Sequence, residues 1–128
     1  MRVVLIVEDD PGIQDVLRFL AEANDLRVVA ADTCETAIRE AEAQRPDLAI
    51  VDLGLPDRDG IQLIQSIRTW SQLPIIVLTA RALDSQKKAA ISAGADEYLT
   101  KPFSAPELLA RMRALLNRRA PEVPPAGP

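Results

Sequence analysis

The chain of 128 residues has the length of one domain, and its 48% apolar and 27% charged residues are typical of soluble globular proteins. Its net charge of −4 argues against nucleic-acid binding by the chain itself, and 3% aromatic residues are too few for stacking platforms. The absence of histidine excludes His-based triads and His metal sites. The single cysteine, Cys34, excludes an internal disulfide, is expected near a helix start and indicates a reducing, cytoplasmic location.

Five short runs that predict strands, most of them apolar, alternate with segments of helical periodicity. The runs cover residues 3–7, 26–31, 48–52, 74–79 and 97–100. The first, third and fourth runs are apolar almost throughout, which is typical of strands buried on both faces of a parallel sheet. The first run is too short for a signal peptide or a membrane span.

The segments between and after these runs predict helices. They are expected at 10–22, before Pro46 with Asp32 or Thr33 as cap, after Gly60, at 84–93 with Gly94 as the stop, and from the capping box Ser104-x-x-Glu107 onward. Apolar residues at helical spacing, most of them expected to face inward, are Ile13, Val16, Leu17, Leu20, Ala37, Ile38, Ala41, Ile61, Ile64, Ile67, Trp70, Ala90, Ile91, Leu108, Leu109, Met112, Leu115 and Leu116.

Five successive strand–helix units predict an α/β fold. Right-handed crossovers give a doubly wound, flavodoxin-like parallel sheet of five strands in the order 2-1-3-4-5, with five helices distributed over both faces. Residues 1–119 are expected to form this domain. Residues 120–128 contain four prolines and are expected to form a linker or tail.

Polar residues stand where four of the strands end. Glu8 and Asp9 follow the first strand, Asp52 ends the third, Thr79 ends the fourth and Lys101 follows the fifth. The carboxyl ends of parallel strands share one edge of the sheet, so these side chains are expected to meet there. Carboxylates suit Mg²⁺, while an ammonium and a hydroxyl suit a phosphoryl group. A carboxylate beside a metal can accept a phosphoryl group as an aspartyl phosphate.

Each of these residues has a simpler interpretation when it is taken alone. Asp52 could only cap a turn, and Glu8 and Asp9 could be the acidic first turn of a helix. Thr79 could merely end a strand, and Lys101 before a proline could belong to a plain turn. Their joint occurrence at the right strand ends favours phosphoryl chemistry.

Over residues 2–119 the chain resembles the receiver domain of two-component response regulators. The motifs that carry the resemblance are Val7-Glu-Asp-Asp10, Asp52-x-x-x-Pro-x-x-Asp-Gly60, Thr79-Ala80, Gly94-Ala-Asp-Glu-Tyr98 and Lys101-Pro-Phe103. The resemblance implies that Asp52 is the phosphoacceptor and that a histidine kinase is the donor. It also implies that Thr79 and Lys101 contact the phosphoryl group.

The resemblance further implies a metal and a switch. Mg²⁺ would be held by Glu8, Asp9, Asp52 and the backbone carbonyl of Gly54, and the Lys101–Pro102 bond would be cis. On phosphorylation Thr79 would move toward the phosphoryl group and the Tyr98 ring would turn inward, repacking the fourth helix, fifth strand and fifth helix. Tyr98 taken alone could equally be a half-buried core aromatic.

Three segments resemble the OmpR/PhoB class of transcription regulators: Gly94-Ala-Asp-Glu-Tyr98, Lys101-Pro-Phe-Ser104 and Glu107-Leu-Leu-Ala-Arg-Met-Arg113. Dimers of this class pair the faces made by helix four, strand five and helix five. The matching cross-subunit ion pairs would be Lys87 with Glu107, Glu97 with Arg111, and Asp96 with Arg118. The class usually has Asp at position 97, and solvated helix charges are the simpler interpretation of these residues.

The function expected from this class is transcription control through a C-terminal winged-helix DNA-binding domain outside this chain. A stand-alone receiver that binds a partner protein is the alternative. A phosphohydrolase would need a second Asp at position 54, where the chain has Gly54. A flavin or nucleotide module would need a phosphate loop after the first strand, where Glu8 and Asp9 would repel phosphate. We therefore expect a signalling switch limited to self-phosphorylation and slow self-dephosphorylation, not a conventional enzyme.

Overall fold

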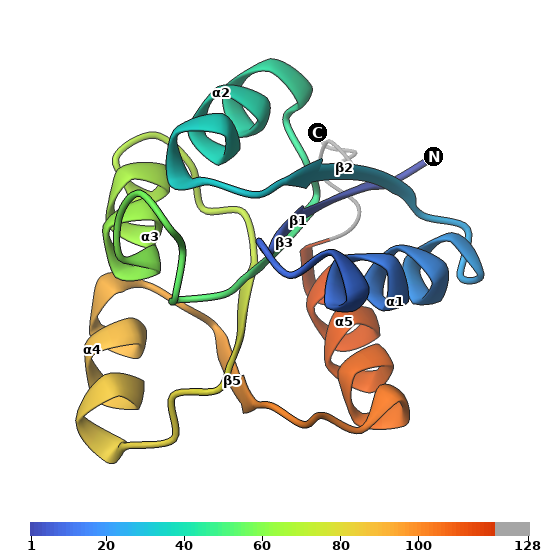
Figure 1. Cartoon of the computed structure of the whole chain (residues 1–128). Helices are drawn as coiled ribbons and strands as arrows, with labels where there is room; N and C mark the ends of the chain where they lie inside the picture. The colour runs from blue at the N-terminus through green and yellow to red at the C-terminus, as the bar shows by residue number, and fades with distance from the viewer. Residues whose placement is uncertain (120–128) are drawn as a thin grey trace.

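Strands and helices alternate strictly along residues 1–119, the part of the chain that the computed structural model describes (Figure 1). The elements are β1 (Val3–Val7), α1 (Pro11–Glu22), β2 (Arg27–Ala31), α2 (Cys34–Gln44), β3 (Leu48–Val51), α3 (Gly60–Arg68), β4 (Ile75–Thr79), α4 (Asp84–Ala93), β5 (Glu97–Thr100) and α5 (Ala105–Arg119). The expected proline-rich tail at 120–128 lies outside the described residues. None of the described helices has the length and apolar character needed to cross a membrane.

The five strands form one parallel sheet in the order β2-β1-β3-β4-β5. In Figure 1, α1 and α5 lie side by side on one side of the sheet, and α2, α3 and α4 lie on the other. The predicted doubly wound, flavodoxin-like fold is therefore confirmed. With β1 and β3 adjacent at the centre, their carboxyl ends bring segments more than 40 residues apart together.

The core consists of two apolar layers, one on each face of the sheet. Alternate residues of a strand point to opposite faces, so Val4 and Ile6 join the layer beneath α1 and α5, while Leu5 and Val7 join the layer beneath α2, α3 and α4. Every residue of β1, β3 and β4 is buried, as their apolar runs predict. These three strands form the fixed base of the site.

Side-chain caps fix the starts of most helices. Asp10 accepts from Gly12 N (2.9 Å), and Asp59 accepts from Ile61 N (2.9 Å). Of the two caps considered for α2, Thr33 is the one used. At α5, Ser104 accepts from the Glu107 N–H, as in the first half of the expected capping box.

The α4 helix differs from the expectation in its apolar face. Ala90 is buried as predicted, but Ile91 is 43% exposed, so its predicted inward position is wrong. Neighbouring helical residues point about 100° apart, and only one of them can face the sheet directly. Val16 on α1 likewise stays 49% exposed, while Leu63, absent from the predicted stripe of α3, is fully buried.

Candidate functional site

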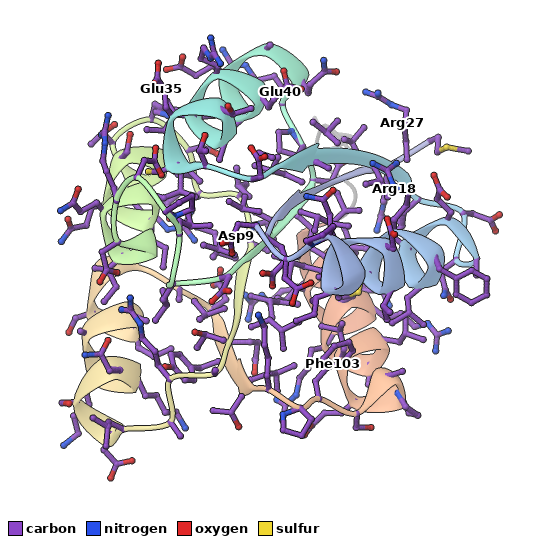
Figure 2. The ribbon with its side chains drawn as sticks, viewed as in Figure 1. Asp9, Arg18, Arg27, Glu35, Glu40 and Phe103 are labelled. Atoms are coloured by element: carbon purple, nitrogen blue, oxygen red, sulfur yellow. The ribbon has the colours of Figure 1, made fainter. Side chains whose placement is uncertain are left out.

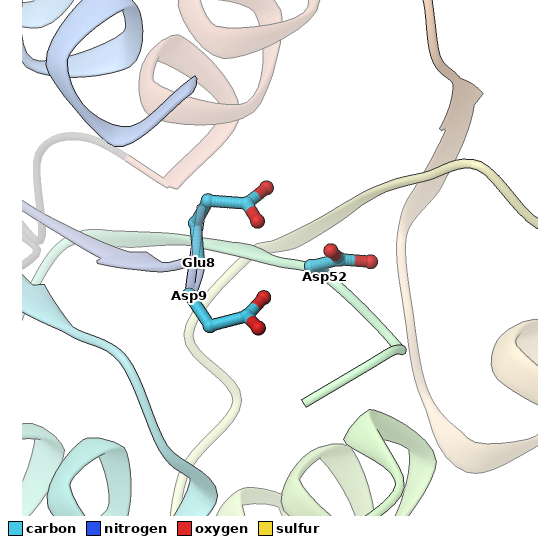
Figure 3. Close-up of side chains that lie close together, drawn as sticks. All are labelled: Glu8, Asp9 and Asp52. Carbon is cyan, nitrogen blue, oxygen red and sulfur yellow. The ribbon is translucent and has the colours of Figure 1, made fainter. Parts of the chain in front are cut away.

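Two adjacent strand ends build the acidic part of the site. Glu8 N donates to Ala31 O (3.0 Å) and Asp52 N donates to Val7 O (3.0 Å), so both residues extend the hydrogen-bond ladder of the sheet. Their carboxylates, with that of Asp9, each offer an oxygen within 4.8 Å of the others (Figure 3). Glu8 and Asp52 are buried, and Asp9, labelled in Figure 2, is exposed.

Lys101 reaches this cluster from the residue after β5. Its Nζ lies 2.7 Å from Glu8 Oε1 and 3.0 Å from Asp52 Oδ2. The Lys101–Pro102 bond is cis, as the resemblance implies. Three strand ends thus bring together a cation and three carboxylates that are far apart in the sequence.

Burial and hydrogen bonding have opposite effects on the charges of this cluster. Burial opposes ionisation of Asp52, but the hydrogen bonds from Gly54 N–H and the Lys101 ammonium outweigh it and lower the pKa of Asp52. For Glu8 burial prevails and raises the pKa. Burial also opposes the charge of Lys101, yet both carboxylates together raise its pKa. Asp52 is therefore an anion at neutral pH, as a nucleophile requires.

The donor set fits a hard divalent cation. Three carboxylates this close repel one another, and the single ammonium on the Glu8–Asp52 side offsets one of their three negative charges. Mg²⁺ prefers oxygen ligands of this kind and retains several waters. Gly54 lies two residues after Asp52, and its N–H donates to Asp52 Oδ1 (3.2 Å). A Cβ on Gly54 would meet no other atom within 4 Å. The space beside Gly54 is thus open.

The loop after β3 holds Asp52 in place. Gly60 N donates to Leu53 O (2.8 Å), and a Cβ on Gly60 would lie 2.5 Å from the carbonyl oxygen of Asp52. Only glycine fits against this backbone. Two hydrogen bonds that the sequence did not predict join this loop to the start of α2. The Asp57 carboxylate accepts from Cys34 N (2.8 Å) and Glu35 N (3.0 Å).

The two expected switch residues flank Arg81, the second residue after Thr79. Thr79 is buried at the end of β4, and its side-chain hydrogen bond contributes to the lowered pKa of Asp52. Tyr98 is half-buried, and its hydroxyl donates to Arg81 O (2.7 Å). The Arg81 guanidinium lies 2.8 Å from Asp59 Oδ2. The sequence marks Arg81 by its place two residues after Thr79, but it does not predict the contacts of Arg81 with Asp59 and Tyr98.

The expected dimer charges pair largely with one another within one chain. Ion pairs join Glu97 to Arg111 (2.9 Å), Arg111 to Glu107 (3.8 Å) and Asp96 to Arg118 (3.3 Å). Among the described residues no ion pair within 4.0 Å involves the remaining member, Lys87, which lines an open groove along α4. The cross-subunit pairs stay a prediction.

Comparison with known proteins defines the family. Residues 4–113 match the response regulator receiver domain, and the chain belongs to this family. Its members are signalling proteins, which sets the chain apart from conventional enzymes. The chain is 49% identical over 122 residues to KdpE, the KDP operon transcriptional regulatory protein of Escherichia coli K12, an OmpR/PhoB-class regulator.

The match covers 95% of this chain but 54% of KdpE, so the chain spans about half the length of the curated relatives it matches. The segments at 52–57, 68–71 and 80–81 are those in which the sequence predicts a likeness to KdpE.

Two solved receiver domains are close in structure. The BeF3-activated receiver of Klebsiella pneumoniae RstA matches with a TM-score of 0.86 and 30% identity, covering 90% of this chain and 98% of that one. The receiver of the Pseudomonas aeruginosa sensor histidine kinase PA1611, with magnesium in its active-site cleft, matches with a TM-score of 0.83 and 34% identity. It covers 91% of this chain and 98% of that one.

Proposed function

We propose that this chain is the phosphorylatable switch of a two-component phosphorelay and that Asp52 accepts a phosphoryl group from a sensor histidine kinase. The observation that carries the proposal is the setting of Asp52: buried, with a lowered pKa, 3.0 Å from Lys101 Nζ and close to two other carboxylates. An Asp52 carboxylate oxygen forms the new bond to phosphorus as the bond between phosphorus and the donor imidazole nitrogen breaks. Positioning and charge neutralisation suffice for such a transfer.

In this proposal the carboxylates of Glu8, Asp9 and Asp52, with the Gly54 carbonyl, hold Mg²⁺. When bound, the metal would neutralise charge on the phosphoryl oxygens. Lys101, whose ammonium already contacts Asp52, would neutralise charge on the phosphoryl oxygens as well. The magnesium reported in the PA1611 active-site cleft supports this assignment.

The proposed response to phosphorylation is a population shift centred on Thr79 and Tyr98. Thr79 binds a phosphoryl oxygen, and Tyr98 gives up its hydrogen bond to Arg81 O and turns inward. The face built by α4, β5 and α5 repacks because Tyr98 lies on β5 and α4 has few buried contacts.

The proposed output is homodimerisation through this face and transcription control in the cytoplasm, through a C-terminal DNA-binding domain outside this chain. The similarity to KdpE supports the class of output. The ion pairs that dimerisation would use are satisfied within one chain in the structure. Cross-subunit pairing would therefore replace ion pairs within one chain by ion pairs between two chains. Such an exchange adds little affinity, but it determines the register of the dimer and the choice of partner.

Intact-mass measurement with acetyl phosphate as donor tests the proposal. The chain should gain one phosphoryl group when Mg²⁺ is present and much less when EDTA replaces it. The Asp52→Ala variant should gain none, while Asp15→Ala, at an exposed position of α1, serves as the control and should still be labelled. Labelling of Asp52→Ala at the parental rate would remove the assignment.

A further inference from the structure

Arg81 is bonded through its backbone to both residues of the proposed switch. Its N–H donates to Thr79 Oγ1 (3.4 Å), and its carbonyl accepts from the Tyr98 hydroxyl (2.7 Å). A change in the position of Arg81 therefore changes the surroundings of both side chains. The side chain of Arg81 makes further contacts of its own.

The Arg81 side chain crosses from the loop after β4 to the loop after β3. Nη1 donates to Asp59 Oδ2 (2.8 Å) and to Gln86 Oε1 (3.1 Å), and Nη2 donates to Leu53 O (3.3 Å). Leu53 directly follows Asp52, and Gln86 is in the first turn of α4. The Arg81 guanidinium thus connects the loop after β3, which follows Asp52, with the first turn of α4.

The Asp59 end of this contact is held independently of Arg81. Asp59 Oδ1 accepts from Ile61 N (2.9 Å) as the cap of α3, and the backbone of Asp59 pairs with that of Gly54. These contacts orient the Asp59 carboxylate without any contribution from Arg81. An ion pair with one end fixed loses less side-chain freedom on forming than one between two free side chains.

We infer that the Asp59–Arg81 ion pair is a restraint on the switch, with Arg81 acting as a positioning residue that favours the observed arrangement of Tyr98. The inference rests on the proposed function, in which Tyr98 must leave the Arg81 carbonyl. Contacts made in only one of two arrangements shift the population toward it. Loss of the ion pair moves the protein toward the inward-Tyr98 arrangement before phosphorylation. With both side chains partly exposed, the expected shift is about two- to fivefold.

The chain offers a direct probe because Tyr98 is its only tyrosine. Incorporation of 3-fluorotyrosine gives a single fluorine resonance that reports the surroundings of this ring. The full chain is titrated with beryllofluoride in the presence of Mg²⁺, and the midpoint of the change in resonance is measured. Asp59→Asn is the first variant, because asparagine keeps a capping oxygen for α3 and removes the charge.

The restraint predicts a midpoint about two- to fivefold lower in Asp59→Asn and in Arg81→Gln. The double variant should shift no further than either single one, because both remove the same interaction. Arg81→Lys, which keeps a charge for Asp59, should restore part of the parental midpoint. Arg18→Gln is the matched control, because it breaks an exposed ion pair with Glu22 on α1, and should leave the midpoint unchanged.

Two failures can be told apart. If the parent resonance does not respond to beryllofluoride, the proposed function is wrong, and the restraint with it. If the parent responds but Asp59→Asn and Arg81→Gln keep its midpoint, or shift no more than Arg18→Gln, only the restraint is wrong. Arg81 lies in a loop, so Arg81→Gln decides the outcome if thermal unfolding shows Asp59→Asn to be misfolded.

Discussion

At the scale of single residues, Asp57 shows how an exposed side chain can organise the site. Its carboxylate accepts from the N–H groups of Cys34 and Glu35 at the start of α2. The hydrogen bond from Cys34 is the largest cause of the lowered pKa of Asp57. A lowered pKa in the folded chain means that ionised Asp57 stabilises the fold.

The pH dependence follows from that direction. The contribution of Asp57 is fully present above its ordinary pKa of 3.8 and is lost as pH falls through the lowered value in the folded chain. Asp57→Ala should therefore reduce the free energy of unfolding at pH 7, and the difference from the parent should shrink below pH 3.8. Urea unfolding at pH 7 and below pH 3.8 measures this difference in the free energy of unfolding. Asp15→Ala is the control, because Asp15 is an exposed residue of α1. A difference independent of pH would contradict this account.

Some residues of the site could be predicted from the sequence and others could not, for a physical reason. Glu8, Asp52, Thr79 and Lys101 stand at the ends of apolar strands, so the topology alone brings them together. Asp57 acts on backbone groups 22 and 23 residues away, and no local pattern marks that kind of contact. The partners of Arg81 also come from separate loops, whose mutual distance the sequence does not specify.

At the scale of elements, α3 and α4 differ in how firmly they are held. Four residues of α3 are buried, and Asp59 caps its first turn. In α4 only Ala90 is buried, and its N-cap, Leu83, is 68% exposed and supplies no side-chain hydrogen bond. A helix with few buried contacts opens at low free-energy cost, which suits a movable element.

Hydrogen exchange should show this difference. The amides of α4 should exchange faster than those of α3 under native conditions, because local opening of α4 costs less. Leu83→Asp introduces a capping side chain and should slow exchange in α4 by the equivalent of about 1 kcal/mol. Mass-spectrometric exchange of both peptides measures the effect, with α3 as internal control. Equal protection of the two helices in the parent would contradict the assignment of α4 as the movable element.

The alternation of strands and helices was predictable because each element carries its own periodicity and stop signals. The error at Ile91 has a physical cause. An apolar pair such as Ala90-Ile91 does not say which of its members faces the sheet, and in α4 too few other apolar residues define the stripe. In the predicted stripe of α5, Leu108, Met112, Leu115 and Leu116 are buried, and Leu109 is partly buried against the same layer.

At the scale of the whole molecule, the proposed output is association of two chains through α4, β5 and α5. Beryllofluoride with Mg²⁺ should raise the sedimentation coefficient from that of a monomer toward that of a dimer. Arg111→Glu places like charges against Glu97 and should weaken the dimer by about tenfold. Arg113→Glu is the matched control, because Arg113 on the same helix bonds to Asn24 near the end of α1. A monomer with and without beryllofluoride at high concentration would remove this part of the proposal.

The central claim is that Asp52 carries the phosphoryl group. Acetyl phosphate and Mg²⁺ should form an acyl phosphate that borohydride reduces to the alcohol, so peptide mass spectrometry can identify the reduced residue. The account predicts reduction at Asp52 alone, and much less of it when EDTA replaces Mg²⁺. Reduction at Glu8, Asp9 or another carboxylate, with Asp52 unmodified, would contradict it.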